Sequence, residues 1–159
     1  MCALLLAAAT IAPARQAAGT IVVSASEFFD QIPKGDTIGG GFNNTAWLFN
    51  NEAIQLGSAE DVLANISIPE SGTYHLFVRS GGTQDSSFQV AIGGKLSLVV
   101  FGKGPLGIKS GGAFELRKGT AQIGLTSISP RAMFNVLVLS KNPNFQEKDL
   151  ESLELPAEV

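Results

Sequence analysis

Short runs of alternating apolar and polar residues dominate the chain from Thr20 onward. In residues 62–68, for example, every second residue is apolar, and alternate residues of a strand share one face of a sheet. Gly, Asn, Asp or Pro closes each run, as is typical where strands end. The pattern predicts about ten short strands, at residues 20–24, 46–49, 53–56, 62–68, 73–79, 87–92, 96–101, 113–116, 120–126 and 132–139.

Two of these runs indicate how the strands are arranged. Residues 132–139 are apolar on both faces, which predicts a central strand. The turn sequence Pro69-Glu70-Ser71-Gly72 separates the runs at 62–68 and 73–79, and it predicts a hairpin. Short strands at regular spacing, with no sustained helical period, predict an all-β protein with an antiparallel architecture, built as a β-sandwich or a barrel.

Composition narrows the classes of protein to consider. The 159 residues are 45% hydrophobic and include 18 Gly and 7 Pro, which suits one domain rich in turns. A net charge of −3 with scattered Lys and Arg argues against nucleic acid as a partner. With one Cys and one His, disulfide frameworks, zinc clusters and cysteine-histidine catalysis within the chain are excluded.

The two ends of the chain differ from the middle. Residues 1–18 combine a short apolar run with Ala12-Pro13-Ala14, which predicts a signal peptide and a secreted or periplasmic protein, although no positive charge precedes the run. An alanine-rich helix is the alternative. The run is too short to span a bilayer, so no transmembrane segment is predicted. Residues 146–159 are acidic and fit a linker, which we prefer, or a short terminal helix.

Candidate catalytic motifs are weak. Residues 102–107 match G-x-G-x-x-G, but nothing helical follows and Pro105 lacks an N–H donor, so we interpret them as a plain loop. His75 is the only imidazole, and catalysis would require a nucleophile and an orienting carboxylate beside it. No catalytic residue is assigned, and we predict that the protein is not an enzyme.

The segment from Ile66 to Arg79 resembles the strand-turn-strand signature of galactose-binding-like jelly rolls. This architecture is that of many non-catalytic carbohydrate-binding modules of secreted bacterial enzymes. Similar segments follow in the same order at residues 88–94, 114–120, 134–139 and 142–145. The resemblance spans residues 20–145 and implies a jelly-roll β-sandwich over that range.

The resemblance also bears on metals. Members of this group often hold a structural calcium with glutamates on the first strand and an aspartate near the closing strand. The corresponding residues here are Ser24, Ser26 and Asn135, which lack the carboxylate charge that calcium prefers. We therefore expect no metal and no cofactor, with Glu27 and Asp30 as the residues from which a shifted site could be built.

Four residues are predicted to contact a ligand: Trp47, His75, Phe77 and Arg79. A sugar needs an apolar platform and planar polar side chains, and the last three share the face opposite the presumed core. The alternatives are that Trp47 is a core or rim residue and that Phe77 and Arg79 pack beneath a loop.

The resulting hypothesis is a non-catalytic carbohydrate-binding or accessory module of an exported protein. Its expected partners are a polysaccharide or glycan and a companion enzyme domain. The alternative is a structural or protein-interaction β-sandwich without sugar affinity. A small hydrolase is a third class, and it requires a nucleophile beside His75.

Overall fold

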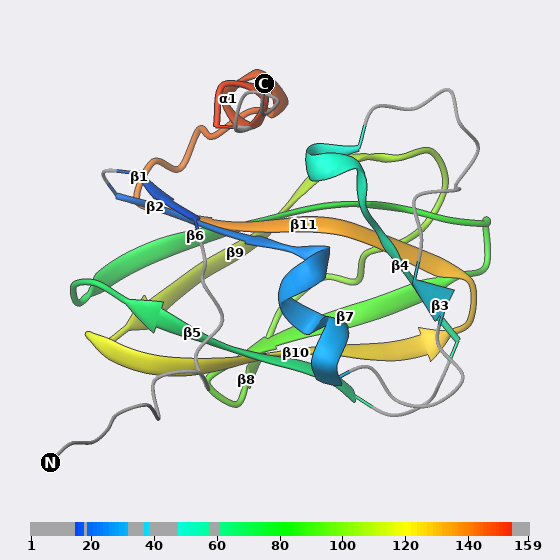
Figure 1. Cartoon of the computed structure of the whole chain (residues 1–159), viewed down its shortest axis with the longest axis horizontal. Coiled ribbons are helices and arrows are strands. Elements are labelled where there is room, and N and C mark those ends of the chain that lie inside the picture. The colour runs from blue at the N-terminus through cyan, green and yellow to red at the C-terminus, as the bar shows by residue number, and fades with distance from the viewer. Residues whose placement is uncertain (1–14, 18, 32–36, 39–47, 58–60, 154–159) are drawn as a thin grey trace, which may run out of the picture.

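The computed structural model describes residues 15–17, 19–31, 37–38, 48–57 and 61–153. Two antiparallel β-sheets lie face to face (Figure 1). The larger sheet contains β1 (Arg15–Ala17), β2 (Thr20–Ser24), β3 (Thr37–Ile38), β4 (Ile54–Leu56), β6 (Gly72–Gly81), β9 (Gly107–Leu116) and β11 (Ala132–Ser140). The smaller sheet contains β5 (Asp61–Ile68), β7 (Ser87–Ile92), β8 (Lys95–Leu96) and β10 (Gly119–Ser129). Three short helices are η2 (Ala25–Gln31), η3 (Phe49–Asn51) and α1 (Glu147–Glu151).

Strand β11 is the centre of the larger sheet. On one side it pairs with β2 through residues 136–140 and with β4 through residues 132–134. On the other side it pairs with β6, which in turn pairs with β9. Every residue of β11 is buried, so the prediction of a central strand that is apolar on both faces is confirmed.

The main hydrophobic core lies between the two sheets. Alternate residues of β5, β6, β7 and β10 point into it, which confirms the inward faces predicted from the alternation. At its centre the Phe134 ring meets Phe28 edge-on, with ring centroids 5.4 Å apart, and meets Phe88 at 6.3 Å. These findings confirm the antiparallel β-sandwich.

The predicted hairpin between residues 62–68 and 73–79 is wrong. Strand β5 belongs to the smaller sheet and pairs with β10, whereas β6 belongs to the larger sheet and pairs with β11 and β9. The turn between them therefore carries the chain from one sheet to the other. The connection from β9 to β10 also crosses between the sheets. Alternation could not reveal this, because both strands face the same core in either arrangement.

Two strand predictions also need correction. The predicted strand at 96–101 is wrong after its first residue: β8 ends at Leu96, and Leu98 is 92% exposed. The Ser97 hydroxyl accepts a hydrogen bond from the Val90 N–H and donates one to Val99 O, and these bonds turn the chain. In the predicted strand at 46–49, Phe49 begins helix η3 instead, and residues 46 and 47 lie outside the described part. Conversely, the Gly-rich residues 107–112 form the first part of β9.

The chain after β11, residues 141–153, forms what we call the terminal segment, and it packs on the outer face of the larger sheet (Figure 1). Phe145 and Leu150 are buried there together with Phe77, Val136 and Val138. Of the two interpretations of the acidic tail, the structure contains the short helix, α1. Residues 154–159, like residues 1–14, lie outside the described residues.

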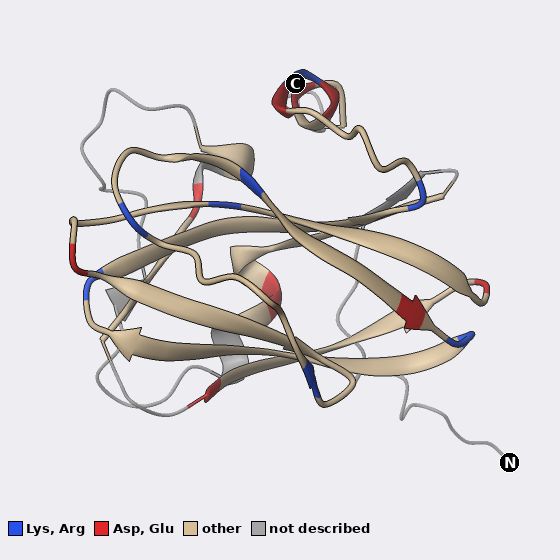
Figure 2. Cartoon of the chain, turned by 180° about the vertical axis from the view of Figure 1, so that it is seen from behind, with Lys and Arg blue, Asp and Glu red and all other residues tan. Residues whose placement is uncertain are grey.

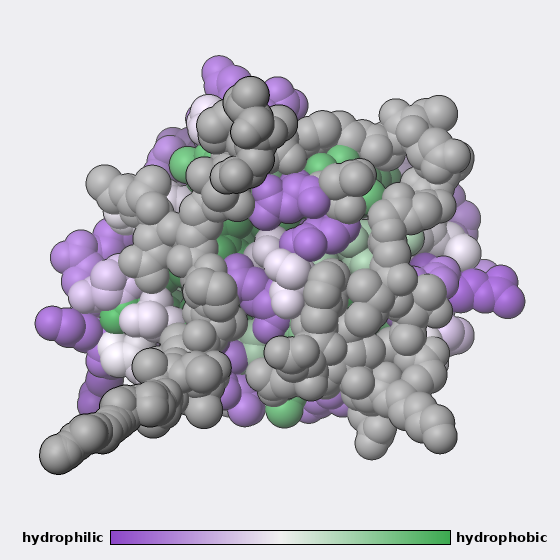
Figure 3. Space-filling model, in the orientation of Figure 1, coloured by the Kyte–Doolittle hydropathy of each residue, from purple (hydrophilic) through white to green (hydrophobic). Residues whose placement is uncertain are grey.

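The surface of the described residues is mixed in character. Lys and Arg are spread over strands and loops and do not gather on one face (Figure 2). Among the coloured residues of Figure 3, hydrophobic ones show only in small separate areas. No helix in the described part of the chain is long and apolar enough to cross a membrane.

Candidate functional site

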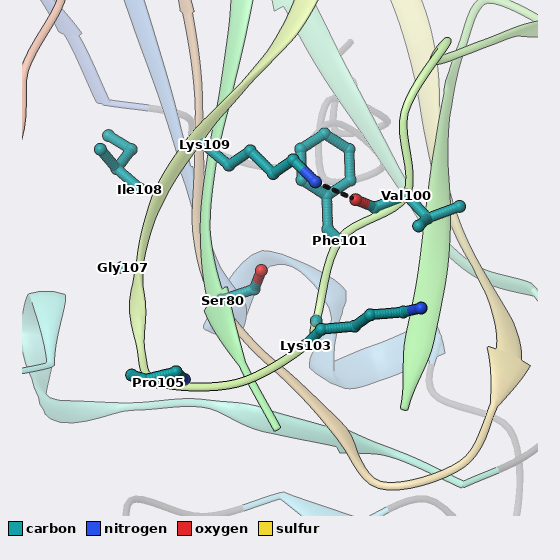
Figure 4. Close-up of a pocket in the computed structure, with 9 residues that line it drawn as sticks. Ser80, Val100, Phe101, Lys103, Pro105, Gly107, Ile108 and Lys109 are labelled. Carbon is teal, nitrogen blue, oxygen red and sulfur yellow. Dashed lines mark hydrogen bonds between the residues drawn. The ribbon is translucent and has the colours of Figure 1, made fainter. Parts of the chain in front are cut away.

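A pocket of about 260 Å³ lies where the connection from β8 to β9 passes the ends of β6 and β9 (Figure 4). We call it the loop pocket. Strand β6 contributes Ser80, and β9 contributes Gly107, Ile108 and Lys109. The connection supplies the remaining lining residues, which are Val100, Phe101, Gly102, Lys103 and Pro105.

The connection that forms the pocket wall is held in place by hydrogen bonds to its main chain. Phe101 pairs with Phe88 at the start of β7, through two bonds of 2.8 and 2.9 Å. The Ser86 hydroxyl donates to Gly102 O at 2.5 Å. The Gly82 N–H donates to Gly104 O at 2.8 Å. Because these bonds tie the loop to the rest of the sandwich, the pocket is preformed.

Gly102 is required by two features of this loop. Its φ is +93°, which L side chains rarely adopt. A Cβ atom at this position would also lie 2.7 Å from the Ala132 Cβ and 2.9 Å from the Phe88 ring. The loop can therefore approach the core closely only because residue 102 has no side chain.

The lining combines apolar surface with hydrogen-bond donors. Phe101 is 1% exposed and closes the base of the pocket against the core. The Lys109 ammonium group crosses to Val100 O and donates a hydrogen bond of 3.0 Å (Figure 4). Lys103 lies exposed at the rim. In the sequence only the Gly-rich run points to this site, because Ser80 and residues 100–109 meet only in the folded chain.

Of the four residues predicted to contact a ligand, the three in the described part of the chain do not line this pocket. Trp47 lies outside the described residues. His75 is half-buried on the outer face of β6, opposite Ser140 of β11. The Ser140 hydroxyl accepts a hydrogen bond of 3.0 Å from the Asn142 N–H and lies 3.4 Å from the Thr20 hydroxyl. These two contacts engage the one hydroxyl that β11 places opposite His75.

Phe77 and Arg79 lie beneath the terminal segment. The Phe77 ring is 5.6 Å from the Phe145 ring, centroid to centroid. Arg79 is 4% exposed, and its Nε donates to a carboxylate oxygen of Glu147 at 2.8 Å. This arrangement corresponds to the alternative in which both side chains pack under another part of the chain. Ligand contact by Phe77 and Arg79 stays a prediction.

Asn135 is the centre of a buried polar network on the same face. It occupies a β-bulge of β11, between Phe134 and Val136. Its Oδ1 accepts hydrogen bonds from the Phe49 N–H at 3.1 Å and from Arg79 Nη1 at 3.0 Å. Its Nδ2 donates to Phe49 O at 3.2 Å and to Glu52 O at 2.8 Å. The side-chain amide is thus fully used in joining β11 to η3 and β6.

The residues around Asn135 do not fit a calcium ion. The Asn135 Nδ2 donor is directed at two main-chain carbonyls that a cation would need as ligands, and the Arg79 guanidinium adds a positive charge. The Ser24 and Ser26 hydroxyls lie 3.1 Å from each other, and the main-chain N–H groups of these serines donate to Glu27 and Glu52. Within the described residues, no group of three His, Cys, Asp or Glu side chains could hold a metal.

Neither calcium nor a chelator is expected to change the melting temperature. A ligand that binds only the folded state raises that temperature by mass action, and the network around Asn135 offers a cation no such site. Differential scanning calorimetry with calcium chloride and then with excess EDTA measures this. A fall of several degrees on chelation would instead show that Glu27, Asp30 or main-chain carbonyls form a site; the side chain of Asp30 lies outside the described part of the structure.

This chain is similar to known proteins in its fold but not in its sequence. No protein-family model matches the sequence, and no curated protein matches it. The GH26-CBM35 β-(1,4)-mannanase of Podospora anserina superposes with a TM-score of 0.62 at 16% identity, over 81% of this chain and 29% of the mannanase. This chain therefore spans under a third of that enzyme.

Two isolated domains match along nearly their whole length. The C-terminal CBM6 of a marine laminarinase from Zobellia galactanivorans has a TM-score of 0.55 at 18% identity, over 77% of this chain and 99% of that domain. The CBM36-1 domain of a xylanase from the hindgut metagenome of Trinervitermes trinervoides has a TM-score of 0.55 at 16% identity, over 77% of this chain and 98% of that domain. The chain therefore has the jelly-roll fold of carbohydrate-binding modules, which confirms the predicted fold class.

Proposed function

We propose that the protein is a non-catalytic carbohydrate-binding module of an exported protein, and that the loop pocket is its glycan site. The pocket carries this proposal, because it is preformed and half-open and combines apolar surface with polar groups. Such a mixed lining suits a sugar, whose ring has apolar C–H faces and hydroxyl edges. The jelly-roll fold shared with two carbohydrate-binding modules supports the same function.

The absence of catalysis is also part of the proposal. Strand β11 places the Ser140 hydroxyl opposite His75, and this hydroxyl is already engaged by Asn142 and Thr20. A hydrolase would need that hydroxyl, or another nucleophile, bonded to the imidazole. Export is supported by the apolar run and small residues within positions 1–18, and a companion enzyme domain stays a prediction.

Filling the loop pocket is expected to abolish glycan binding without unfolding the protein. Gly107 lines the pocket, and a Cβ atom built on it meets nothing within 4 Å, so Gly107→Phe places a ring in the cavity. Affinity electrophoresis against plant, algal and bacterial polysaccharides measures retention. We expect micromolar to millimolar affinity for the unmodified protein, because a small open site buries little of a sugar.

A matched control lies on the same strand. Ser110 of β9 is exposed and does not line the pocket, so Ser110→Phe adds the same ring without filling the cavity. Retention should survive in Ser110→Phe and be lost in Gly107→Phe, with both variants melting cooperatively. If both variants bind alike, the site lies elsewhere. If no polysaccharide retains the unmodified protein, the alternative of a structural or protein-interaction sandwich is correct.

A further inference from the structure

The loop pocket has a charge opposite to that of the whole chain. The formal net charge is −3, yet the described residues that line the pocket include Lys103 and Lys109 and no Asp or Glu. These lysines are six positions apart, and the return of the chain from the loop into β9 places both at one cavity. A negative group that enters the pocket therefore meets two cations and no lining carboxylate.

The hydrogen-bonding capacity of the lining is also one-sided. Its polar side-chain groups are the Ser80 hydroxyl and the two ammonium groups. An ammonium group donates three hydrogen bonds and accepts none. Lys109 uses one donor on Val100 O, and Figure 4 shows its side chain reaching across the cavity above Ser80. Among the lining residues that the structure describes there is no Asn, Gln, Asp or Glu side chain to accept from the hydroxyls of a neutral sugar.

The size of the cavity limits what can occupy it. At about 260 Å³ it lies below the range of roughly 300–1,000 Å³ that is usual for drug-sized ligands. A cavity of this volume can hold one sugar ring of a polysaccharide. The rest of a polymer would lie outside, beside the exposed residues at the rim.

We propose that the loop pocket selects a sugar ring that carries a carboxylate or a sulfate ester, bound by the ammonium groups of Lys103 and Lys109 and by the Ser80 hydroxyl. This inference rests on the proposed function and specifies the class of glycan. The anionic group accepts the hydrogen bonds that the donor-rich lining offers, and charge-assisted bonds of this kind are stronger than neutral ones.

The test uses matched pairs of sugars that differ in the anionic group. Glucuronate and galacturonate are compared with glucose and galactose, and glucose 6-sulfate with glucose, by NMR titration of the full chain. The anionic member of at least one pair should bind about tenfold more tightly than its neutral counterpart. Comparison of the uronate and sulfate pairs identifies which anionic group is preferred.

Lysine variants locate the effect in the pocket. Lys109→Gln should weaken binding of the preferred anionic sugar about tenfold, and Lys103→Gln should weaken it less, because Lys103 lies at the rim. Lys118 is exposed in the turn after β9, at the end opposite the pocket. Lys118→Gln makes the same change in net charge and should leave binding unchanged.

Three results would overturn the inference. Equal binding of charged and neutral sugars would refute selection for an anion, while the proposed glycan-binding function would stand. Equal weakening by Lys118→Gln and Lys109→Gln would show attraction to overall charge and not to the pocket. If no sugar of either kind binds and no polysaccharide retains the protein, the proposed function itself fails, and the inference fails with it.

Discussion

Replacing Asn135 with alanine is expected to lower the free energy of unfolding by roughly 3–5 kcal/mol. The substitution removes four hydrogen bonds, to the Phe49 N–H, Phe49 O, Glu52 O and Arg79. Asn135 and Arg79 are 0% and 4% exposed, so water cannot readily replace the lost bonds, and a buried guanidinium loses a partner. Chemical denaturation with linear extrapolation measures the change.

The control for this variant is an exposed asparagine. Asn144→Ala removes the same amide at the surface and should change the free energy of unfolding by less than about 0.5 kcal/mol. If Asn135→Ala also costs under about 1 kcal/mol, then the bonds of Asn135 contribute little to the fold. In that case the bulge in β11 must be stabilised by packing alone.

Phe145→Ala is expected to destabilise the protein by about 3 kcal/mol. Phe145 is 7% exposed and packs against the Phe77 ring, so its truncation opens a gap between the terminal segment and the larger sheet. We place the cost at the lower end of the usual range for phenylalanine because the gap lies near solvent. The same denaturation experiment measures it, and Glu151→Ala, an exposed change in α1, is the matched control.

The Phe145 variant also tests ligand contact by Phe77 and Arg79. If these residues bind glycan when the terminal segment moves away, loosening that segment should increase glycan binding. If they only anchor the segment, Phe145→Ala should lose stability and leave binding at the loop pocket unchanged. A variant as stable as the unmodified protein would contradict both the burial of Phe145 and its role in holding α1 on the sheet.

The strands themselves were predictable because every second residue of a strand that faces the core is buried and therefore apolar. Residues 62–68 and 87–92 each send alternate apolar side chains into the core, and their sequence shows it directly. Which strands pair could not be predicted, since a turn such as Pro69 to Gly72 is compatible with a hairpin or with a crossing between sheets. The loss of strand structure after Leu96 depends on side-chain bonds of Ser97, which hydrophobic patterning does not detect.

The candidate site was less predictable than the fold. The face of β6 that carries Phe77 and Arg79 was predictable, but the segment that covers it comes much later in the sequence, with Glu147 68 residues after Arg79. Ser80, Lys103 and Lys109 form the pocket through the pairing of β6 with β9 and through the bonds that fix the loop. No local pattern distinguishes these lysines from solvated ones, because their common feature is spatial.

The position of β11 at the centre of the larger sheet has a consequence for folding kinetics. Strand β2, near the start of the described chain, pairs with residues 136–140 of β11, which is the last strand in the sequence. Strands β4 and β6 also pair with β11. During synthesis the ribosome must therefore release almost the whole domain before its larger sheet can assemble. Pairings so distant in sequence fold slowly, because the entropy of closing a long loop is lost before the contacts form. Until β11 emerges, β2 and β4 lack the strand that joins them to β6 and β9, and their apolar faces stay exposed to chaperones that hold unfolded chains.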